Sequence, residues 1–377
     1  MNEKLLNFAK SALSLALCLA AVQLSQAEER KPAAERAGHK VTSSLIAMPI
    51  VFYAPETKWA GGAAGLMTFR IEGQDPASKP SSLYLYAIYT QLEQFFAQMV
   101  PAFYLKNEAY LLHGILTFER YPNKFWGFGN EAPSGAEQNY TPKTSSLEVS
   151  FQRRILAAER LYVGLQFQFE RQKILQPIDG SALDENTVPG SKGGTVSGLG
   201  FILNWDTRNN IFTPSRGNYW QASAFFNGKT FGSDFSFTQV KVDLRTYQPG
   251  IAPSHVLALQ ALYQSATGPI APFYRYAKLG GDSLLRGYYR GRYRDKHYLA
   301  VQAEYRLPVW WKFGVVGFAA LGDVAPAFDK FRIVKFKYAV GMGLRFKIAP
   351  KEGANLRADI AFGPGTTGIY FTAGEAF

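Results

Sequence analysis

Cysteine is almost absent from this chain, and its scarcity excludes several kinds of chemistry. The one cysteine among 377 residues, Cys18, lies in an N-terminal segment that has the pattern of a cleavable export signal. A mature chain without it has no thiol, no disulfide and no cysteine-based metal site. Leu17 stands where a lipoprotein signal has a small residue, so we expect no lipid attachment. An exported chain of this kind depends on its fold alone for stability.

Histidine is also scarce, which argues against a catalytic or metal site. The chain has four histidines. They are His39, His113, His255 and His297. None has a serine or aspartate partner recognisable by spacing, and the His-x-x-x-His spacing of a helical metal site is absent. We therefore predict that the protein is not an enzyme and carries no metal and no cofactor.

Long hydrophobic runs are missing as well. The longest apolar stretch, within 11–22, is shorter than the roughly 20 residues that a membrane helix needs. Yet 15% of the residues are aromatic and the mean hydropathy is −0.12. This combination is typical of a membrane β-barrel, because outward apolar and inward polar residues alternate and cancel in the average. A secreted β-sandwich is the soluble alternative, but the apolar faces are too numerous and too aromatic for one sandwich core.

The chain divides into three predicted parts. Residues 1–27 have a basic start with Lys4 and Lys10, an apolar centre and the small-x-small site Ser25-Gln26-Ala27, which together predict a cleaved signal peptide. Residues 28–43 form a polar tail. Residues 44–377 form the barrel, and the signal predicts export to the cell outer membrane.

Sixteen alternating segments of strand length follow one another from residue 44 onward. An even number of antiparallel strands closes a barrel with both termini in the periplasm. The connections 121–143, 172–194 and 266–296 are long and are predicted to be extracellular, whereas the turns near 156–159, 248–253 and 348–353 are predicted to be periplasmic. The predicted strands are 44–54, 60–72, 82–92, 95–105, 109–120, 144–155, 160–171, 195–205, 217–228, 235–247, 254–265, 297–307, 312–323, 336–347, 354–363 and 368–377.

The alternation also predicts which side chains face inward. In 298–307, Val301 and Leu307 share one face, whereas Glu304 and Arg306 share the other. Lipid outside and water inside require the charged face to line the lumen. The same alternation places three more charged residues of the later strands inside: Arg345, Arg357 and Asp359.

A loop rich in glycine, arginine and tyrosine precedes the segment 298–307. It reads Gly280-Gly281-Asp282-Ser283-Leu284-Leu285-Arg286-Gly287-Tyr288-Tyr289. Its glycines suit a tight backbone with positive φ. This stretch resembles the sixth-loop motif of the bacterial surface-antigen superfamily, which includes outer-membrane assembly proteins and two-partner-secretion transporters. The resemblance implies a sixteen-stranded antiparallel transmembrane barrel with an inward-folded loop between strands 11 and 12.

Further motifs of this family recur in order over about 195–377, whereas the first half resembles it only in architecture. The motifs are Asn204-Trp205-Asp206-Thr207-Arg208-Asn209-Asn210 with Pro214 and Arg216-Gly217, then Glu304-Tyr305-Arg306-Leu307-Pro308, Gly341-Met342-Gly343-Leu344-Arg345 and Arg357-Ala358-Asp359. The chain ends with Phe371, Gly374 and Phe377. The resemblance implies that this terminal aromatic strand is the signal that the outer-membrane assembly machinery recognises.

The chain departs from the family pattern in two places. The family's Phe-x-Asp-x-Gly strand reads Phe318-Ala319-Ala320-Leu321-Gly322, so the usual acidic partner of the loop arginine is Ala320, and Asp323 has the opposite parity. The tail 28–43 is too short to fold as a periplasmic polypeptide-transport-associated (POTRA) repeat, so we expect a barrel without such repeats.

The loop 266–296 is therefore predicted to fold into the lumen as a plug. Arg286 is expected to pair with an inward carboxylate, with Glu304 the first choice, Asp359 the second and Asp206 a third. The alternative is an extracellular basic loop that meets phosphates.

The formal net charge of +12 limits the expected partners. A basic cluster runs from Arg286 to Lys296, but nucleic acid is not a routine partner of an exported barrel. We expect contacts with outer-membrane lipids and lipopolysaccharide, and with the assembly machinery during insertion. Without POTRA repeats, substrate capture requires a periplasmic partner or a homo-oligomer.

Family resemblance implies insertion or translocation of polypeptide or lipid at the outer membrane, through a seam between first and last strands that Pro49 weakens. One alternative is an anion-favouring diffusion pore, suggested by four inward cations: Arg306, Arg345, Lys347 and Arg357. A barrel enzyme acting on lipids is a further alternative.

Overall fold

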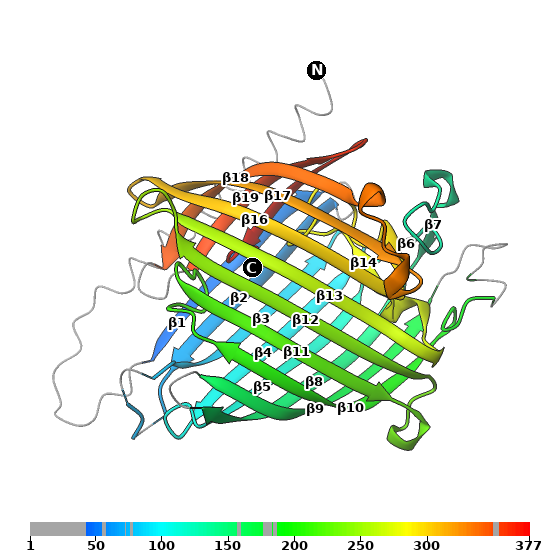
Figure 1. The fold of residues 1–377 in the computed structure, drawn as a ribbon, viewed down its shortest axis with the longest axis horizontal. Coiled ribbons are helices and arrows are strands. Elements are labelled where there is room, and N and C mark those ends of the chain that lie inside the picture. Colours follow the sequence, from blue (N-terminus) through cyan, green and yellow to red (C-terminus); the bar gives the residue numbers. More distant parts are fainter. Residues whose placement is uncertain are drawn as a thin grey trace.

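The computed structural model describes residues 43–54, 58–71, 73–75, 78–156, 160–175, 183, 187–349 and 354–377. The predicted signal peptide and all but the last residue of the predicted tail lie outside these ranges. Sixteen antiparallel strands form one sheet that follows the order of the sequence and wraps around into a barrel (Figure 1). The predicted fold class and strand number are confirmed.

The barrel strands agree with the predicted segments to within a few residues, apart from the last one. They are β1 (Ser44–Ala54), β2 (Lys58–Phe69), β3 (Ser81–Thr90), β4 (Phe95–Leu105), β5 (Tyr110–Arg120), β8 (Pro142–Leu156), β9 (Leu161–Ile174), β10 (Gly193–Asp206), β11 (Gly217–Asn227), β12 (Ser236–Pro249), β13 (Val256–Ile270), β16 (His297–Trp310), β17 (Phe313–Ala325), β18 (Lys337–Ala349), β19 (Ala354–Gly363) and β20 (Thr366–Ala373).

The connections contain short elements that alternation in the sequence does not reveal. Three-residue strands are too short to show a period. Two pairs of them form small antiparallel ladders: β6 (Asn123–Phe125) with β7 (Gln138–Tyr140), and β14 (Ala277–Leu279) with β15 (Tyr293–Asp295). The 3₁₀ turns are η1 (Ser134–Ala136), η2 (Lys229–Phe231), η3 (Phe273–Arg275), η4 (Phe328–Lys330) and η5 (Ile333–Lys335).

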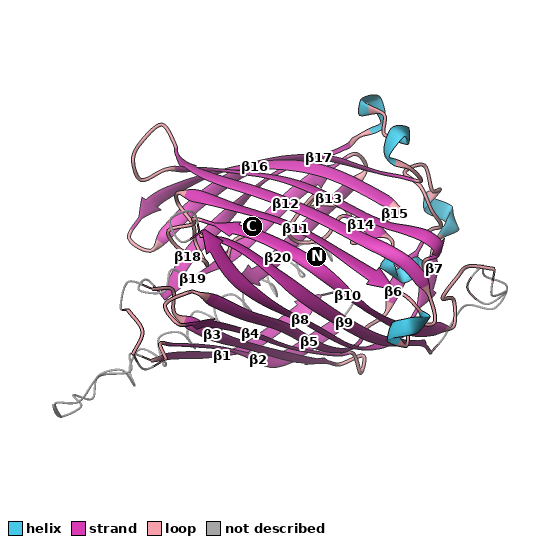
Figure 2. Ribbon diagram, turned by 60° about the horizontal axis from the view of Figure 1, so that its bottom comes forward, coloured by secondary structure: helices cyan, strands magenta, loops and turns pink. Residues whose placement is uncertain are grey.

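The two ends of the barrel differ in their connections. We call one the long-loop end, because it carries the β5–β8, β9–β10, β13–β16 and β17–β18 connections. The other, the short-turn end, carries the β8–β9, β12–β13, β16–β17 and β18–β19 connections. Figure 2 shows the helical turns gathered at the long-loop end.

Side chains alternate across the barrel wall as the sequence predicts. In β16, Val301 is 43% exposed on the outer face, whereas Glu304 is fully buried inside. In β18, Met342 and Leu344 are exposed outside, whereas Arg345 is buried inside. The outer face is apolar and the inner face polar, as a barrel in lipid requires.

The barrel is wrapped but its two edge strands are not joined. Strands β1 and β20 stand at the ends of the sheet order, and over their described residues no ladder pairs them. Closure by hydrogen bonds, expected from the even number of strands, is therefore not seen. Two features of these strands reduce the available bonds: Pro49 in β1 has no amide proton, and β20 has only eight residues.

The last strand is shorter than predicted. The pattern predicted a strand over 368–377, but β20 ends at Ala373. Gly374 adopts a φ of +84°, which favours glycine and turns the chain out of the strand. Phe377 then packs inside the barrel against Tyr247 of β12, with ring centroids 6.2 Å apart. The terminal aromatic residue therefore lies beyond the strand and within the lumen.

Candidate functional site

The long connection between β13 and β16 folds into the barrel. Its β14–β15 ladder stands at the long-loop end, and the segment between them, 280–292, reaches the inner wall. Arg286 lies in this segment and is 1% exposed. The inward-folded loop is thus located where the sequence predicted it, between the eleventh and twelfth barrel strands.

Arg286 bonds two carboxylates on different strands. Its Nη2 donates to Glu304 Oε1 of β16 at 2.6 Å, and its Nη1 donates to Asp359 Oδ2 of β19 at 2.7 Å. Both carboxylates are fully buried. The first and second choices from the sequence are therefore used together, one nitrogen for each, in place of a bidentate bond to a single partner.

An aromatic ring covers the face of the same guanidinium. The Arg286 Cζ lies 3.4 Å from the ring centroid of Phe318 in β17. A cation above an aromatic face is stabilised by the negative potential of the ring. Sequence reasoning did not assign a role to Phe318, although it opens the Phe-Ala-Ala-Leu-Gly segment in which an acidic partner was sought. Ala320 of that segment packs in an apolar cluster with the loop residues Leu279 and Leu285.

The turn that presents Arg286 depends on its glycines. Gly280 has a φ of +98° and Gly281 a φ of +123°, which other residues rarely adopt. The Gly281 amide donates to the Tyr288 carbonyl at 3.1 Å and so closes the turn. The Gly287 amide donates to the Tyr370 hydroxyl of β20 at 2.8 Å. These bonds hold the turn against the last strand.

Tyr288 fastens the loop at one more point. Its hydroxyl donates to the carbonyl of Tyr338 at 3.1 Å, and its ring packs beside Tyr293. Nearby, Arg357 Nη2 donates to the backbone carbonyl of Asp282 at 2.9 Å. Arg357 also donates to the Thr372 hydroxyl of β20.

The ion pairs continue from the loop to the C-terminus. Arg345 bridges Asp359 Oδ1 at 2.5 Å and Glu375 Oε2 at 2.8 Å. Arg306 bonds Glu304 Oε2 at 2.9 Å and donates to the Phe377 carbonyl oxygen at 3.0 Å. Two chains of contacts therefore connect the loop arginine with the C-terminal residues. We call this group the anchor network: Arg286, Glu304, Arg306, Arg345, Asp359 and Glu375.

Asp206, the third carboxylate choice, belongs to a separate cluster. It pairs with Lys79 Nζ at 2.7 Å and with Arg208 Nε at 2.9 Å. Burial lowers the pKa of Lys79, and the charge of Asp206 opposes that change. Asp206 lies at the end of β10 and contacts the β2–β3 connection, so it supports the short-turn end and does not hold Arg286.

Two other basic residues of the loop, Arg292 and Arg294, bond backbone carbonyls within the protein. Arg294 is buried between the rings of Phe125 and Phe273, and its Nη2 donates to the Lys124 carbonyl at 3.1 Å. Arg292 donates to the Ala132 carbonyl at 2.9 Å. The alternative reading of Arg286 as an external phosphate contact is therefore wrong, because its guanidinium is buried in the anchor network.

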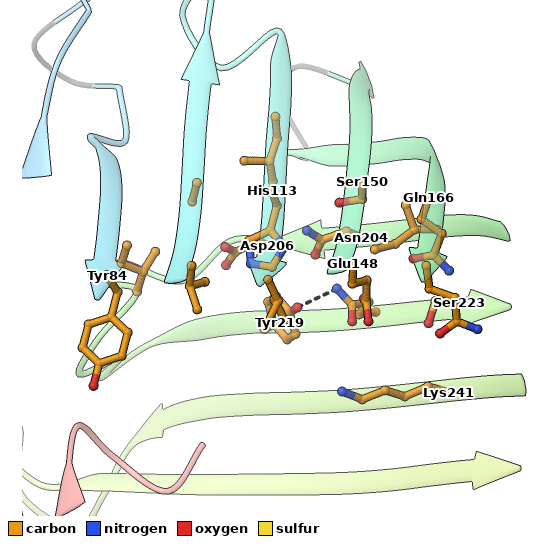
Figure 3. Close-up of a pocket in the computed structure, with 18 of the residues that line it drawn as sticks. Tyr84, His113, Glu148, Ser150, Gln166, Asn204, Asp206, Tyr219, Ser223 and Lys241 are labelled. Atoms are coloured by element: carbon orange, nitrogen blue, oxygen red, sulfur yellow. Dashed lines mark hydrogen bonds between the residues drawn. The ribbon is translucent and has the colours of Figure 1, made fainter. Parts of the chain in front are cut away.

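A cavity lined by both polar and apolar side chains occupies the opposite side of the lumen. The loop packs against β16 to β20, and a cavity of about 870 Å³ remains along β1 to β13. Most of the side chains labelled in Figure 3 carry an amide or a hydroxyl group, and the charged residues Glu148 and Lys241 lie beside them. Gln221 Nε2 donates to the Tyr219 hydroxyl at 2.7 Å within this lining.

Loop residues bound the cavity at its long-loop side. Lys278 of β14 and Arg290 line it from the loop. Burial, together with nearby Arg294 and Arg290, lowers the pKa of Lys278 to about 7. An apolar cluster beside it fills the long-loop end: Phe125, Tyr140, Ile174, Leu183, Val188, Val196, Phe235, Phe237, Ala266, Ala271, Phe273 and Tyr274.

No group of three His, Cys, Asp or Glu side chains in the described ranges is arranged to hold a metal ion. No helix in the described part of the chain is long and apolar enough to cross a membrane.

A sixteen-stranded barrel with an apolar outer face and a loop arginine anchored in its lumen defines a transmembrane β-barrel of the outer-membrane type. The profile of the Omp85 superfamily domain matches residues 101–377, which is more than half of the chain. The chain therefore belongs to the Omp85 superfamily, whose members are outer-membrane proteins. This confirms the family resemblance, and the match extends well before the region 195–377 that carried the motifs.

Two solved structures show the same fold. BamA from Haemophilus ducreyi lacking POTRA domains 1–3 aligns with a TM-score of 0.57 at 15% identity, over 89% of this chain and 69% of that one. CdiB from Acinetobacter baumannii aligns with a TM-score of 0.54 at 15% identity, over 88% of this chain and 59% of that one. A comparison with curated proteins finds no match.

Proposed function

We propose that this protein inserts or translocates polypeptide or lipid at the outer membrane. The proposal rests on one observation in this barrel of the Omp85 superfamily. Over their described residues, the two edge strands β1 and β20 form no ladder with each other. An edge strand with free amides and carbonyls is a template for another strand. A substrate strand therefore has a place to pair at β1 or β20, in the region where Pro49 already weakens the ladder.

The anchor network supports the same proposal. The loop bonds β20 through Gly287 and bonds β19 through Arg286. Because these strands stand next to the open edge, the loop fixes the wall beside the proposed seam. We infer that the barrel faces its short-turn end toward the periplasm, with export through the predicted signal peptide. Capture of substrate there requires a periplasmic partner or a second copy of the chain.

A folding assay tests the proposed function. Lipid vesicles with the reconstituted protein would receive a urea-unfolded small outer-membrane barrel, and its folding would be followed by heat-modifiable electrophoretic mobility. Control vesicles would hold a diffusion porin. We expect faster folding in the presence of the Omp85 barrel, and equal rates in the two vesicle types would contradict the proposal for polypeptide insertion.

The anion-favouring pore is a second candidate, and the ion pairs weigh against it. Arg306 and Arg345 face the lumen, but each bonds carboxylates of the anchor network. A paired arginine presents little free positive charge to a passing anion. The apolar cluster at the long-loop end also narrows the path for hydrated solutes.

A further inference from the structure

The connection between β17 and β18, residues 326–336, exposes apolar side chains at the long-loop end. Ile333 is 87% exposed, Val334 is 92% exposed and Phe328 is 65% exposed. Grouped apolar side chains with this exposure mark a surface that another apolar phase covers. We call this connection the β17–β18 loop.

Basic side chains alternate with these apolar residues. Lys330 pairs with Asp329 at 3.1 Å, and Lys335 pairs with Glu131 at 2.7 Å. Both lysines remain well exposed at their side chains. Arg332 stands between them, and no carboxylate of the described residues lies within ion-pair distance of it. The loop therefore offers positive charge beside an apolar tip.

The loop lies over the outer face of the barrel. The Phe328 ring packs edge-on against the ring of Tyr263 in β13, with centroids 5.7 Å apart. Tyr263 is paired with Leu299 of β16, which shares the outward parity of Val301. The Tyr263 hydroxyl is also hydrogen-bonded to His297 Nδ1 at 2.8 Å. These contacts place the start of the loop on the lipid side of the wall.

The β17–β18 loop lies at the level of the membrane interface at the long-loop end. Trp310 and Trp311, both strongly exposed, stand at the short-turn end of β16 and are typical of an interfacial aromatic girdle. The distance between Trp310 and Leu299 along the barrel axis is roughly 28 Å, for a strand that rises about 3.3 Å per residue and is tilted by about 40°. The apolar band of such barrels is about 25 Å tall. The level of Leu299 and Tyr263 is therefore the opposite interface.

We propose that the β17–β18 loop is an interfacial anchor that binds the anionic lipid leaflet at the long-loop end. Ile333 and Val334 insert among the acyl chains next to the headgroups, and Arg332 and Lys330 bind headgroup phosphates. Apolar insertion beside basic side chains is the chemistry that recognises an anionic lipid surface. This site does not depend on the proposed transport function, since it needs only a barrel in a membrane.

Spin labelling tests the insertion directly. Full-length chains with Cys18→Ser and a single new cysteine, either Val334→Cys or the control Ser134→Cys, would carry a nitroxide label. Ser134 is exposed in η1, at the same end of the barrel. In phosphatidylcholine vesicles with phosphatidylglycerol, we expect the label at 334 to collide more with dissolved oxygen, and the label at 134 more with a water-soluble nickel chelate. Equal nickel accessibility at both positions would overturn insertion and favour a protein partner for the loop.

A second comparison tests the charges. We expect the label at 334 to lie deeper when phosphatidylglycerol is present than in pure phosphatidylcholine. The substitution Arg332→Gln should remove that difference while leaving folding of the barrel unchanged, because Arg332 lies outside the barrel wall. Equal depth in the two lipids with Arg332 intact would overturn phosphate binding.

Discussion

At the scale of single residues, Arg286 shows how a buried charge is tolerated inside a barrel. A buried ion is stable only when partners replace its water shell. The anchor network supplies three arginines and three carboxylates in direct contact: Arg286, Arg306 and Arg345 with Glu304, Asp359 and Glu375. Arg357 also lies 3.7 Å from Asp359, and it pairs with Asp282 at 3.4 Å. With this further pair the charges still balance, although the chain as a whole is strongly basic.

Removing one member of this network should be costly. Arg286→Ala leaves Glu304 and Asp359 without their shared cation, and breaking a buried pair in this way destabilises by about 3 to 5 kcal/mol. Urea unfolding of the refolded barrel would measure the change in free energy. Glu304→Ala and the double variant complete a thermodynamic cycle. We expect the double variant to lose clearly less free energy of unfolding than the sum of the two single losses. Additive losses would contradict a direct interaction between Arg286 and Glu304.

The sequence predicted the members of this site better than their arrangement. Alternation placed Glu304, Asp359 and Arg345 on the inner face, because charge must avoid lipid. It did not reveal that Arg286 divides its nitrogens between two strands, since the distance across a lumen depends on barrel shape. Phe318 was missed for the same reason: a phenylalanine on the inner face gives no signal in the sequence until a cation is found above it.

At the scale of elements, the inward-folded loop depends on a few backbone positions. Gly280→Ala would place a Cβ 2.5 Å from the Tyr289 carbonyl oxygen at a φ of +98°. Strain of this kind costs about 1 to 3 kcal/mol. We expect faster protease cleavage within 280–292 of the refolded variant. The control Gly228→Ala meets open space with an extended backbone, and should behave like the wild type. Equal protection of Gly280→Ala would show that this turn does not fix the loop.

The C-terminal residues form a second inward element. The family resemblance assigned Phe377 to recognition by the assembly machinery, and the structure also packs its buried ring against Tyr247. Phe377→Ala should therefore lower the stability of a barrel refolded in detergent without any machinery, by about 3 kcal/mol. Phe371→Ala on the outer face is the control. Unchanged stability of the Phe377 variant would restrict that residue to a recognition role.

Strand positions were predictable because the clearest barrel strands, such as β9, β10 and β16, alternate, and the exceptions have physical causes. The chain leaves β20 at Gly374 because of a backbone turn that the apolar pattern does not record. The ladders β6–β7 and β14–β15 are too short to show a period. The unpaired edges β1 and β20 follow from hydrogen bonding across the wrap of the sheet, which no local pattern specifies.

At the scale of the whole molecule, the lumen is divided between a filled side and a hollow side. The loop occupies the side of β16 to β20, and Phe377 extends from there to Tyr247 of β12. The hollow side holds the cavity along β1 to β13, bounded by Lys278 and Arg290 of the same loop. Movement of the loop would therefore alter both sides at once.

Single-channel conductance of the refolded barrel in planar bilayers tests the central claim that the loop plugs the lumen. Wild-type protein would be compared with a variant that lacks residues 280–295, which include Arg286 and its turn. We predict a closed or flickering wild type and a steady, larger conductance after the deletion. A steady large conductance of the wild type, unchanged by the deletion, would contradict the plug and favour the diffusion pore.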